Sequence, residues 1–348
     1  MHGQLKMKMR CLTPSGRRRC PLRLGGDTAA FCASLVEGLA HLENTLDVDG
    51  GGGGSGSVSM RWCADAMQLV KRMQREMLAI FRKADVPVAV VSSCGAGEWF
   101  DHYMQETAAL LDFCNAFKAA VSRLHRYCMV VDIAAQVGRA AVSSLLVSGI
   151  AAPCAGWASE PVQEAPAAVR DKMKSVKVAV TEAERLGMKI MSGAGGDAGG
   201  MVVVTLVAKI TTSVLSMFVL QALASPSHLY AGGVRPTTLS SAVVPELEPW
   251  CESLSLIHAR FPCRATVAEH EQVATVVQDL INGRTDDGGG HGGQEEELLR
   301  RHVELLRARS GELREGVEMF DCVLDEVFDE VIRGRNEMLG ILRDKALT

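Results

Sequence analysis

Aromatic residues and paired metal-ligand motifs are both scarce in this sequence. Phe, Trp and Tyr make up only 5% of the chain, while Ala, Leu, Val and Met are abundant, and this balance favours packed helices. The 11 cysteines include no CxxC pair and no Cys/His spacing typical of a zinc site. Their odd number, with no apolar secretory segment at the N-terminus, indicates reduced thiols in a cytosolic compartment.

Motifs of catalysis and cofactor binding are missing as well. The sequence has no G-x-S-x-G nucleophile motif, no Walker phosphate loop and no HExxH zinc motif. The glycine run at 193–200 contains a formal G-x-G-x-x-A, but the segment before it favours a helix, so a flexible loop is the better interpretation. His125 and Cys128 supply only two metal ligands, and Asp101 and Glu106 are expected on a solvated helix face. We therefore expect no catalytic residue, no cofactor and no metal.

The net charge of the whole chain is small and negative, whereas its N-terminal end is strongly basic. The formal net charge of −4 argues against a general polyanion binder, and no basic patch is interleaved with aromatic residues, so nucleic-acid binding is unsupported. Residues 1–26 are basic, with Arg17, Arg18 and Arg19 in a stretch broken by Pro and Gly. We expect a disordered tail here. A contact of these arginines with anionic lipid and a plastid transit peptide are the alternatives.

The apolar residues recur at helical spacing along most of the chain. This pattern predicts an all-α, multi-helix bundle with long helices, formed as one domain over 27–348. Residues 167–191 are expected to form an amphipathic helix with a mainly basic face. The other helices expected are 27–46, 59–83, 98–133, 201–224, 246–260, 266–281 and 294–347. Flexible glycine-rich linkers are expected near 49–57, 193–200 and 283–293.

Residues 201–224 are the most hydrophobic stretch of the sequence. The stretch is long enough to span a bilayer, which takes about 20 residues. Lys209 lies well inside it, and a lysine at such a place costs about 2.5–3.5 kcal/mol on insertion scales. We favour a buried central helix in which Lys209 is paired or extends to the surface. A single-pass membrane helix, with Lys209 as a membrane-contact residue, is the alternative.

The stretch 294–347 carries apolar residues close to heptad spacing, among them Leu313 and Leu324. Glu and Arg fill many of the positions between them, which is typical of a long charged helix. We favour a helix packed against its own bundle. The alternative is a coiled-coil seam for a partner or a second copy, with Leu313 and Leu324 as contact residues.

One stretch resembles a known family. The residues are Trp99, Asp101, Tyr103, Leu110, Leu111, Asp112, Cys114 and Asn115. Together they resemble the W-x-D-x-Y…K-L-L-D-x-C-N stretch of the plant BYPASS-related, or Roh-like, family. The order of parts is similar too: a basic N-terminus, a long helix, a glycine-rich gap, an apolar helix with one lysine, and an acidic C-terminal helix. The sequence departs from the pattern at its glycine insertions, 50–54 and 288–293, and at Ala109, where the family commonly has lysine.

The resemblance implies a plant-specific, non-enzymatic helical protein. Members of that family are linked to root and shoot development through restraint of a mobile root-derived signal, and others to secretion through binding an exocyst subunit. We therefore expect a cytoplasmic adaptor that acts by protein–protein contact at a membrane surface. Its docking surface would be the face around Trp99, Tyr103 and Asp112, or the C-terminal seam. An enzyme of the signal-synthesis route is a weaker alternative.

Overall fold

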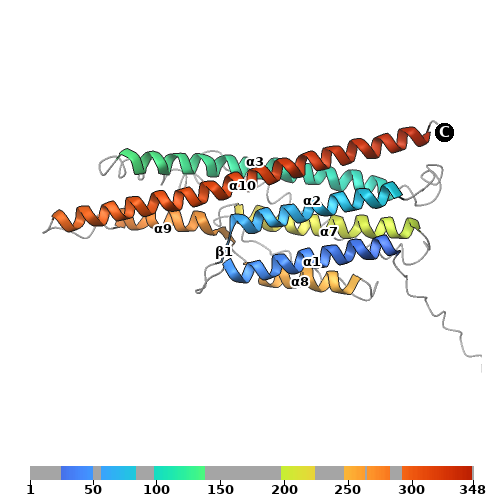
Figure 1. The fold of residues 1–348 in the computed structure, drawn as a ribbon, viewed down its shortest axis with the longest axis horizontal. Helices are drawn as coiled ribbons and strands as arrows, with labels where there is room; N and C mark the ends of the chain where they lie inside the picture. Colours follow the sequence, from blue (N-terminus) through green and yellow to red (C-terminus); the bar gives the residue numbers. More distant parts are fainter. Residues whose placement is uncertain are drawn as a thin grey trace, which may run out of the picture.

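The computed structural model describes residues 25–49, 56–83, 98–137, 197–223, 247–262, 265–282 and 292–346. Nearly all of these residues are helical. They form seven helices that pack against one another, which confirms the predicted all-α bundle. Figure 1 shows an elongated molecule whose helices run along its long axis. Residues 1–24 of the expected tail, with its three arginines, and the expected helix 167–191 lie outside the described residues.

Within the described residues, the helices follow the predicted pattern closely. The elements are α1 Gly26–Asp49, β1 Ser57–Val58, α2 Met60–Lys83, α3 Glu98–Val137, α7 Asp197–Leu223, α8 Glu248–Arg260, β2 Thr266–Val267, α9 Ala268–Asn282 and α10 Gly292–Ala346. Parts of the expected linkers are ordered instead. Asp49 ends α1, Asp197 begins α7 and Gly292 begins α10. Gly200 lets α7 approach α1 closely. A Cβ added at this position would lie 2.9 Å from the Thr28 hydroxyl oxygen.

A short parallel strand pair joins two distant connections, and the sequence does not predict it. Ser57 pairs with Thr266 and Val58 with Val267. Two residues are too few to show the alternation that identifies a strand. Beside this pair, the Met60 backbone N–H donates to both carboxylate oxygens of Glu269 at 3.1 Å. An acidic side chain at this position satisfies an orphan donor and complements the helix dipole at the start of α2.

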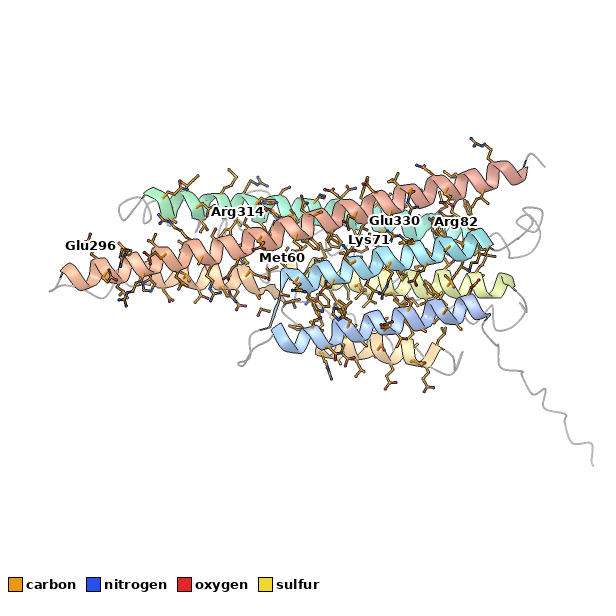
Figure 2. The ribbon with its side chains drawn as sticks, in the orientation of Figure 1. Met60, Lys71, Arg82, Glu296, Arg314 and Glu330 are labelled. Atoms are coloured by element: carbon orange, nitrogen blue, oxygen red, sulfur yellow. The ribbon has the colours of Figure 1, made fainter. Side chains whose placement is uncertain are left out.

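Helices α2 and α10 run parallel and in register. Three ion pairs join them, and in each the two residues are 255 positions apart. Lys71 and Arg82 lie along α2 beside α10, which carries Glu330 (Figure 2). A constant offset over three turns is expected where two helices keep one line of contact. The pairs are Lys71–Glu326 at 2.6 Å, Arg75–Glu330 at 3.1 Å, and Arg82–Glu337.

Helix α3 lies against another side of α10 and runs antiparallel to it. Polar contacts fix the register from end to end, so that the start of α3 meets the end of α10. They are Met104 O to Arg335 Nη1 at 2.6 Å, Lys118 Nζ to Asp321 Oδ1 at 2.6 Å, and Asp132 Oδ1 to Ser310 Oγ at 2.9 Å. Helix α10, with 55 residues, thus extends along both α2 and α3.

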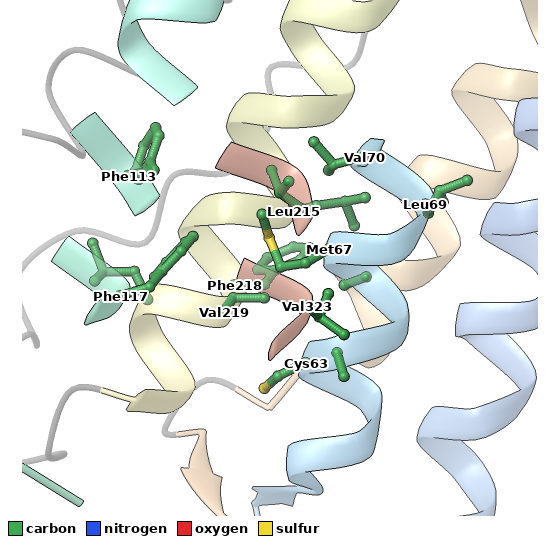
Figure 3. Packing of buried hydrophobic residues seen from close by; sticks show 14 of the residues in the cluster. Cys63, Met67, Leu69, Val70, Phe113, Phe117, Leu215, Phe218, Val219 and Val323 are labelled. Atoms are coloured by element: carbon green, nitrogen blue, oxygen red, sulfur yellow. The ribbon is translucent and has the colours of Figure 1, made fainter. Parts of the chain in front are cut away.

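Helix α7 fills the centre of the bundle. Every residue from Met201 to Leu223 is buried except Lys209 and Gln221, which are half-buried. The helix packs against α2 and α3, and α1 touches it as well. Figure 3 shows this packing, with Leu215, Phe218 and Val219 of α7 among Cys63 and Met67 of α2 and Phe113 and Phe117 of α3. An apolar helix surrounded on all sides is the arrangement expected of a core helix.

Candidate functional site: a buried polar cluster and an outer seam

Two of the residues expected at a docking surface belong to the core. Trp99 is 6% exposed and Tyr103 is 1% exposed. Both rings contact Phe81 of α2, with centroids 4.7 and 5.7 Å apart. The Tyr103 hydroxyl oxygen lies only 2.7 Å from where a Cβ on Gly334 of α10 would be. Their prediction as surface contacts was wrong, because large aromatic rings between three helices gain more from burial than from exposure.

The C-terminal seam is also internal. Leu313 and Leu324 are both fully buried, at 0% exposure. The intramolecular interpretation of the heptad pattern is therefore confirmed, and the alternative in which these leucines contact a partner was wrong. Apolar residues at heptad spacing identify a packed face but do not say which helix covers it. Here α2, α3 and α9 cover α10.

The stretch that resembles the BYPASS-related family divides between the two sides of α3. Trp99, Tyr103, Leu110 and Cys114 are buried. Asp101, Asp112 and Asn115 are exposed. Asp112 follows Asp101 by 11 residues, and Asn115 follows Asp112 by 3. This spacing places the three residues on one strip of the helix. Asp112 is thus the one member of the expected docking residues in the described part of the chain that lies at the surface.

Lys209 belongs to a polar cluster that is buried between α2, α3 and α7. The centre of this cluster is Glu106, which is 3% exposed, so its expected place on a solvated face was wrong. Gln74 donates a hydrogen bond from Nε2 to Glu106 Oε1 at 2.8 Å. Glu106 Oε2, Gln74 Oε1 and Thr212 Oγ1 have no hydrogen-bond partner within the part of the chain that the structure describes. Three buried polar atoms are therefore left unsatisfied around one carboxyl group.

This environment disfavours the ionised form of Glu106. Burial raises the pKa of Glu106, because desolvation penalises the carboxylate, and the contacts with Gln74 and Thr212 and the charge of Lys209 lower it by less. A protonated Glu106 has a hydroxyl to donate, and both Gln74 Oε1 and Thr212 Oγ1 accept. The neutral carboxyl thus fits the cluster better than the carboxylate does. A carboxyl group that is buried in this way is suited to holding helices together rather than to moving protons.

Four thiols, three of them buried and that of Cys251 partly buried, are held in their unreactive form. Burial raises the pKa of Cys32, Cys128 and Cys251 to about 11 and that of Cys114 to about 12. A thiol is a nucleophile only as the thiolate, so these groups stay inert at neutral pH. Among the residues that the structure describes, no three His, Cys, Asp or Glu side chains are arranged to hold a metal ion.

A row of apolar side chains lines the outside of the α3–α10 contact. We call this row the outer seam: Phe100, Met104 and Leu111 of α3 with Phe328, Ile332 and Leu339 of α10. The three residues of α3 are partly buried, and those of α10 are 39%, 37% and 49% exposed. Both triplets follow the spacing i, i+4, i+11, so each lies on one face of its helix. The antiparallel register places Phe100 level with Leu339 and Leu111 level with Phe328.

Sequence reasoning missed the outer seam. The three apolar residues of α10 are not part of the heptad row, and an isolated exposed apolar side chain is ordinary. Their alignment with the triplet of α3 exists only once the two helices are in register. The signal that was available is the shared i, i+4, i+11 spacing on both helices.

Comparison of the chain with protein-family models, with curated proteins and with solved structures finds no match. The arrangement of the side chains is therefore what bears on function. One further property of α7 is relevant. Gly200–Leu223 is long and apolar enough to cross a membrane by length and composition, with a mean hydropathy of 2.0, although 83% of its most apolar window is buried in the bundle.

Proposed function

We propose that this protein is a non-enzymatic helical adaptor of the BYPASS-like type, which acts by protein–protein contact. The observation that carries the proposal is the division of the Trp99–Asn115 stretch. Its aromatic and apolar members attach α3 to the bundle, and its polar members Asp101, Asp112 and Asn115 lie on the outer surface. Exposed polar residues that the fold does not need for packing are suited to a binding role.

The interior supports an adaptor better than an enzyme. The central contact between α2, α3 and α7 is filled by packed side chains, and its polar cluster contains a carboxyl group and amide and hydroxyl groups that face one another. An enzyme needs polar groups that converge on a space for substrate. The buried cluster of this bundle serves the attachment of α7.

The resemblance supplies the kind of partner. In the terms of that family, the adaptor would contact an exocyst subunit in secretion, or restrain a mobile root-derived signal in root and shoot development. We place its action in the cytoplasm at a membrane surface. The strip with Asp101, Asp112 and Asn115 is the contact surface in this proposal.

The experiment is a binding assay between the purified full chain and purified plant exocyst subunits. The variant Asp101→Lys/Asp112→Lys reverses two exposed charges on the strip and is expected to weaken binding by about tenfold, or about 1.4 kcal/mol. The matched control is Glu252→Lys/Glu296→Lys, which reverses two exposed charges on α8 and α10. Circular dichroism checks that both variants keep the helical fold. Binding that is equal in all three proteins, or absent in all, contradicts the proposed contact.

A second candidate function is a membrane protein anchored by α7. The length and hydropathy of Gly200–Leu223 favour it. Insertion would require α7 to leave α2 and α3 and would place Lys209 inside the span. Fractionation of the tagged protein with carbonate and then high-salt washes separates the two candidates. Retention through carbonate supports the anchored protein, whereas release by salt or a soluble protein supports the adaptor.

A further inference from the structure

We propose that the outer seam binds a basic amphipathic helix of a partner protein. This inference deepens the proposed adaptor function and rests on it. It names the chemistry of the partner and the groove in which the partner lies.

The apolar part of the argument is the exposure of the α10 triplet. Leu339 is 49% exposed, Phe328 39% and Ile332 37%. They face the same side as the partly buried Phe100 and Leu111 of α3. Because the two helices lie side by side and antiparallel, the six side chains form one continuous strip rather than scattered single residues.

The length of the seam fits a helix. Eleven residues separate the ends of each triplet, which at about 1.5 Å per residue is about 16 Å, or about three helical turns. A third helix that lies along the line between α3 and α10 would place its own apolar residues at i, i+4, i+7 and i+11 into the strip. This is the helix-in-groove mode of recognition.

The charges beside the seam select the sign of the partner. Asp101 and Asp112 are exposed on the α3 side, and Asp329 is exposed on the α10 side. Both borders of an apolar strip therefore carry carboxylates. Lysine and arginine on the flanks of an amphipathic helix complement such borders and speed the encounter.

The cations close to the seam are already engaged. Lys118 contacts Asp321 at 2.6 Å and Asp325 at 2.8 Å. Arg335 donates from Nη1 to the Met104 carbonyl and to the Thr107 hydroxyl, both at 2.6 Å. They tie α3 to α10. Because Lys118 compensates the charge of Asp325, the acidic character of the borders rests on Asp101 and Asp329. Arg343 is exposed beyond Leu339, at the end of the strip.

The same charges disfavour two other occupants. An anionic membrane would meet carboxylates on both sides of the apolar strip and be repelled. A second copy of this chain, paired seam to seam, would bring acidic borders against acidic borders, since a two-fold interface uses the same patch twice. A basic helix avoids both conflicts.

The test measures binding of synthetic helices to the full chain by fluorescence anisotropy. The probe is a labelled peptide of about 18 residues with leucine at i, i+4, i+7 and i+11 and lysine elsewhere. Its matched control replaces every lysine by glutamate. The seam variant is Ile332→Asp/Leu339→Asp, and its control is Met129→Asp/Ile133→Asp, an apolar pair on α3 outside the seam that is 62% and 47% exposed. Both variants change exposed residues, and circular dichroism verifies their folds.

We expect the leucine–lysine peptide to bind wild type and the control variant alike, with affinity that falls as salt increases. The seam variant is expected to bind at least about tenfold more weakly. Tighter or equal binding of the leucine–glutamate peptide overturns the proposal, as does equal loss in both variants or no binding to wild type.

The other occupants give distinct outcomes. The proposal is wrong if light scattering shows a dimer that only the seam variant abolishes, or if only that variant loses binding to phosphatidylserine vesicles. If the peptide binds at the seam but Asp101→Lys/Asp112→Lys does not change the binding of exocyst subunits, this inference is kept and the proposed contact is refuted. If the peptide does not bind at the seam but the same variant weakens exocyst binding, only this inference is refuted.

Discussion

Replacing Glu106 by glutamine is expected to make the protein more stable at alkaline pH. Glu106 is 3% exposed, and burial raises the pKa of its carboxyl group above the ordinary 4.5. A glutamine at this position still accepts the hydrogen bond from Gln74 Nε2 and brings an amide that can donate to Gln74 Oε1 or Thr212 Oγ1. It removes the cost of holding a carboxylate away from water.

The sign of the pH dependence follows from linkage. Since the folded pKa lies above the unfolded one, the stability that the neutral carboxyl contributes is fully present below about 4.5. This contribution is lost as pH rises through the folded pKa. Each unit by which the pKa is raised corresponds to about 1.4 kcal/mol. We therefore expect Glu106→Gln to exceed wild type by about 1–3 kcal/mol at about pH 8, and the difference to vanish near pH 4.

The assay is urea unfolding followed by circular dichroism at acidic, neutral and mildly alkaline pH. Glu330→Gln is the matched control, since Glu330 is 7% exposed but makes ion pairs with Arg75 and Arg333. Those arginine side chains are 59% and 53% exposed, so we expect a loss of only about 0.5–1 kcal/mol. If Glu106→Gln instead lowers the stability by more than about 1 kcal/mol at about pH 8, the fold stabilises the Glu106 carboxylate, its pKa is not raised, and the reasoning fails.

Three further predictions concern the packing. Gly316→Ala places a Cβ 2.9 Å from an α2 side chain and should cost about 1–3 kcal/mol in thermal melts, whereas Gly311→Ala, with nothing within 4 Å, should stabilise by about 0.5–1 kcal/mol. Leu313→Asp, at a residue with 0% exposure, should abolish the cooperative unfolding transition and lower helical ellipticity, and a folded variant would contradict an internal seam. Trp62→Phe removes the 2.9 Å hydrogen bond from the indole to the Leu42 carbonyl and should lower the free energy of unfolding by about 1–2 kcal/mol; an unchanged value would show that this bond is not needed.

The sequence predicts the helices well because the spacing of apolar residues, which identifies a helix, is a local property of the sequence. Residues 98–133 and 294–347 repeat their apolar residues every three or four positions, and the structure has α3 and α10 there. The apolar stretch 201–224 is long and contains no Gly or Pro, and α7 coincides with it closely. The strand pair was missed for two reasons. Each strand has only two residues, and the paired residues Ser57 and Thr266 are 209 positions apart in the sequence.

Which side of a helix is covered depends on neighbours that periodicity does not identify. Glu106 looks like any acid on a charged helix until α2 and α7 are placed around it. Trp99 and Tyr103 belong to a recognisable stretch, but their burial against Phe81 is a tertiary contact. The outer seam likewise requires the antiparallel register of α3 and α10. The fold class was therefore predictable from the sequence, and the candidate surface was not.

The position of α10 in the chain has a consequence for biosynthesis. Of the described helices, a ribosome delivers α1, α2, α3, α7, α8 and α9 before α10, yet α2 and α3 both pack against α10. Until its 55 residues emerge, the nascent chain exposes the apolar side of α2 and α3 and has only an incomplete bundle around α7. Exposed apolar surface of this kind is the substrate of chaperones. The chain is thus expected to complete its core only after translation has passed α10, and to rely on a holding chaperone until then.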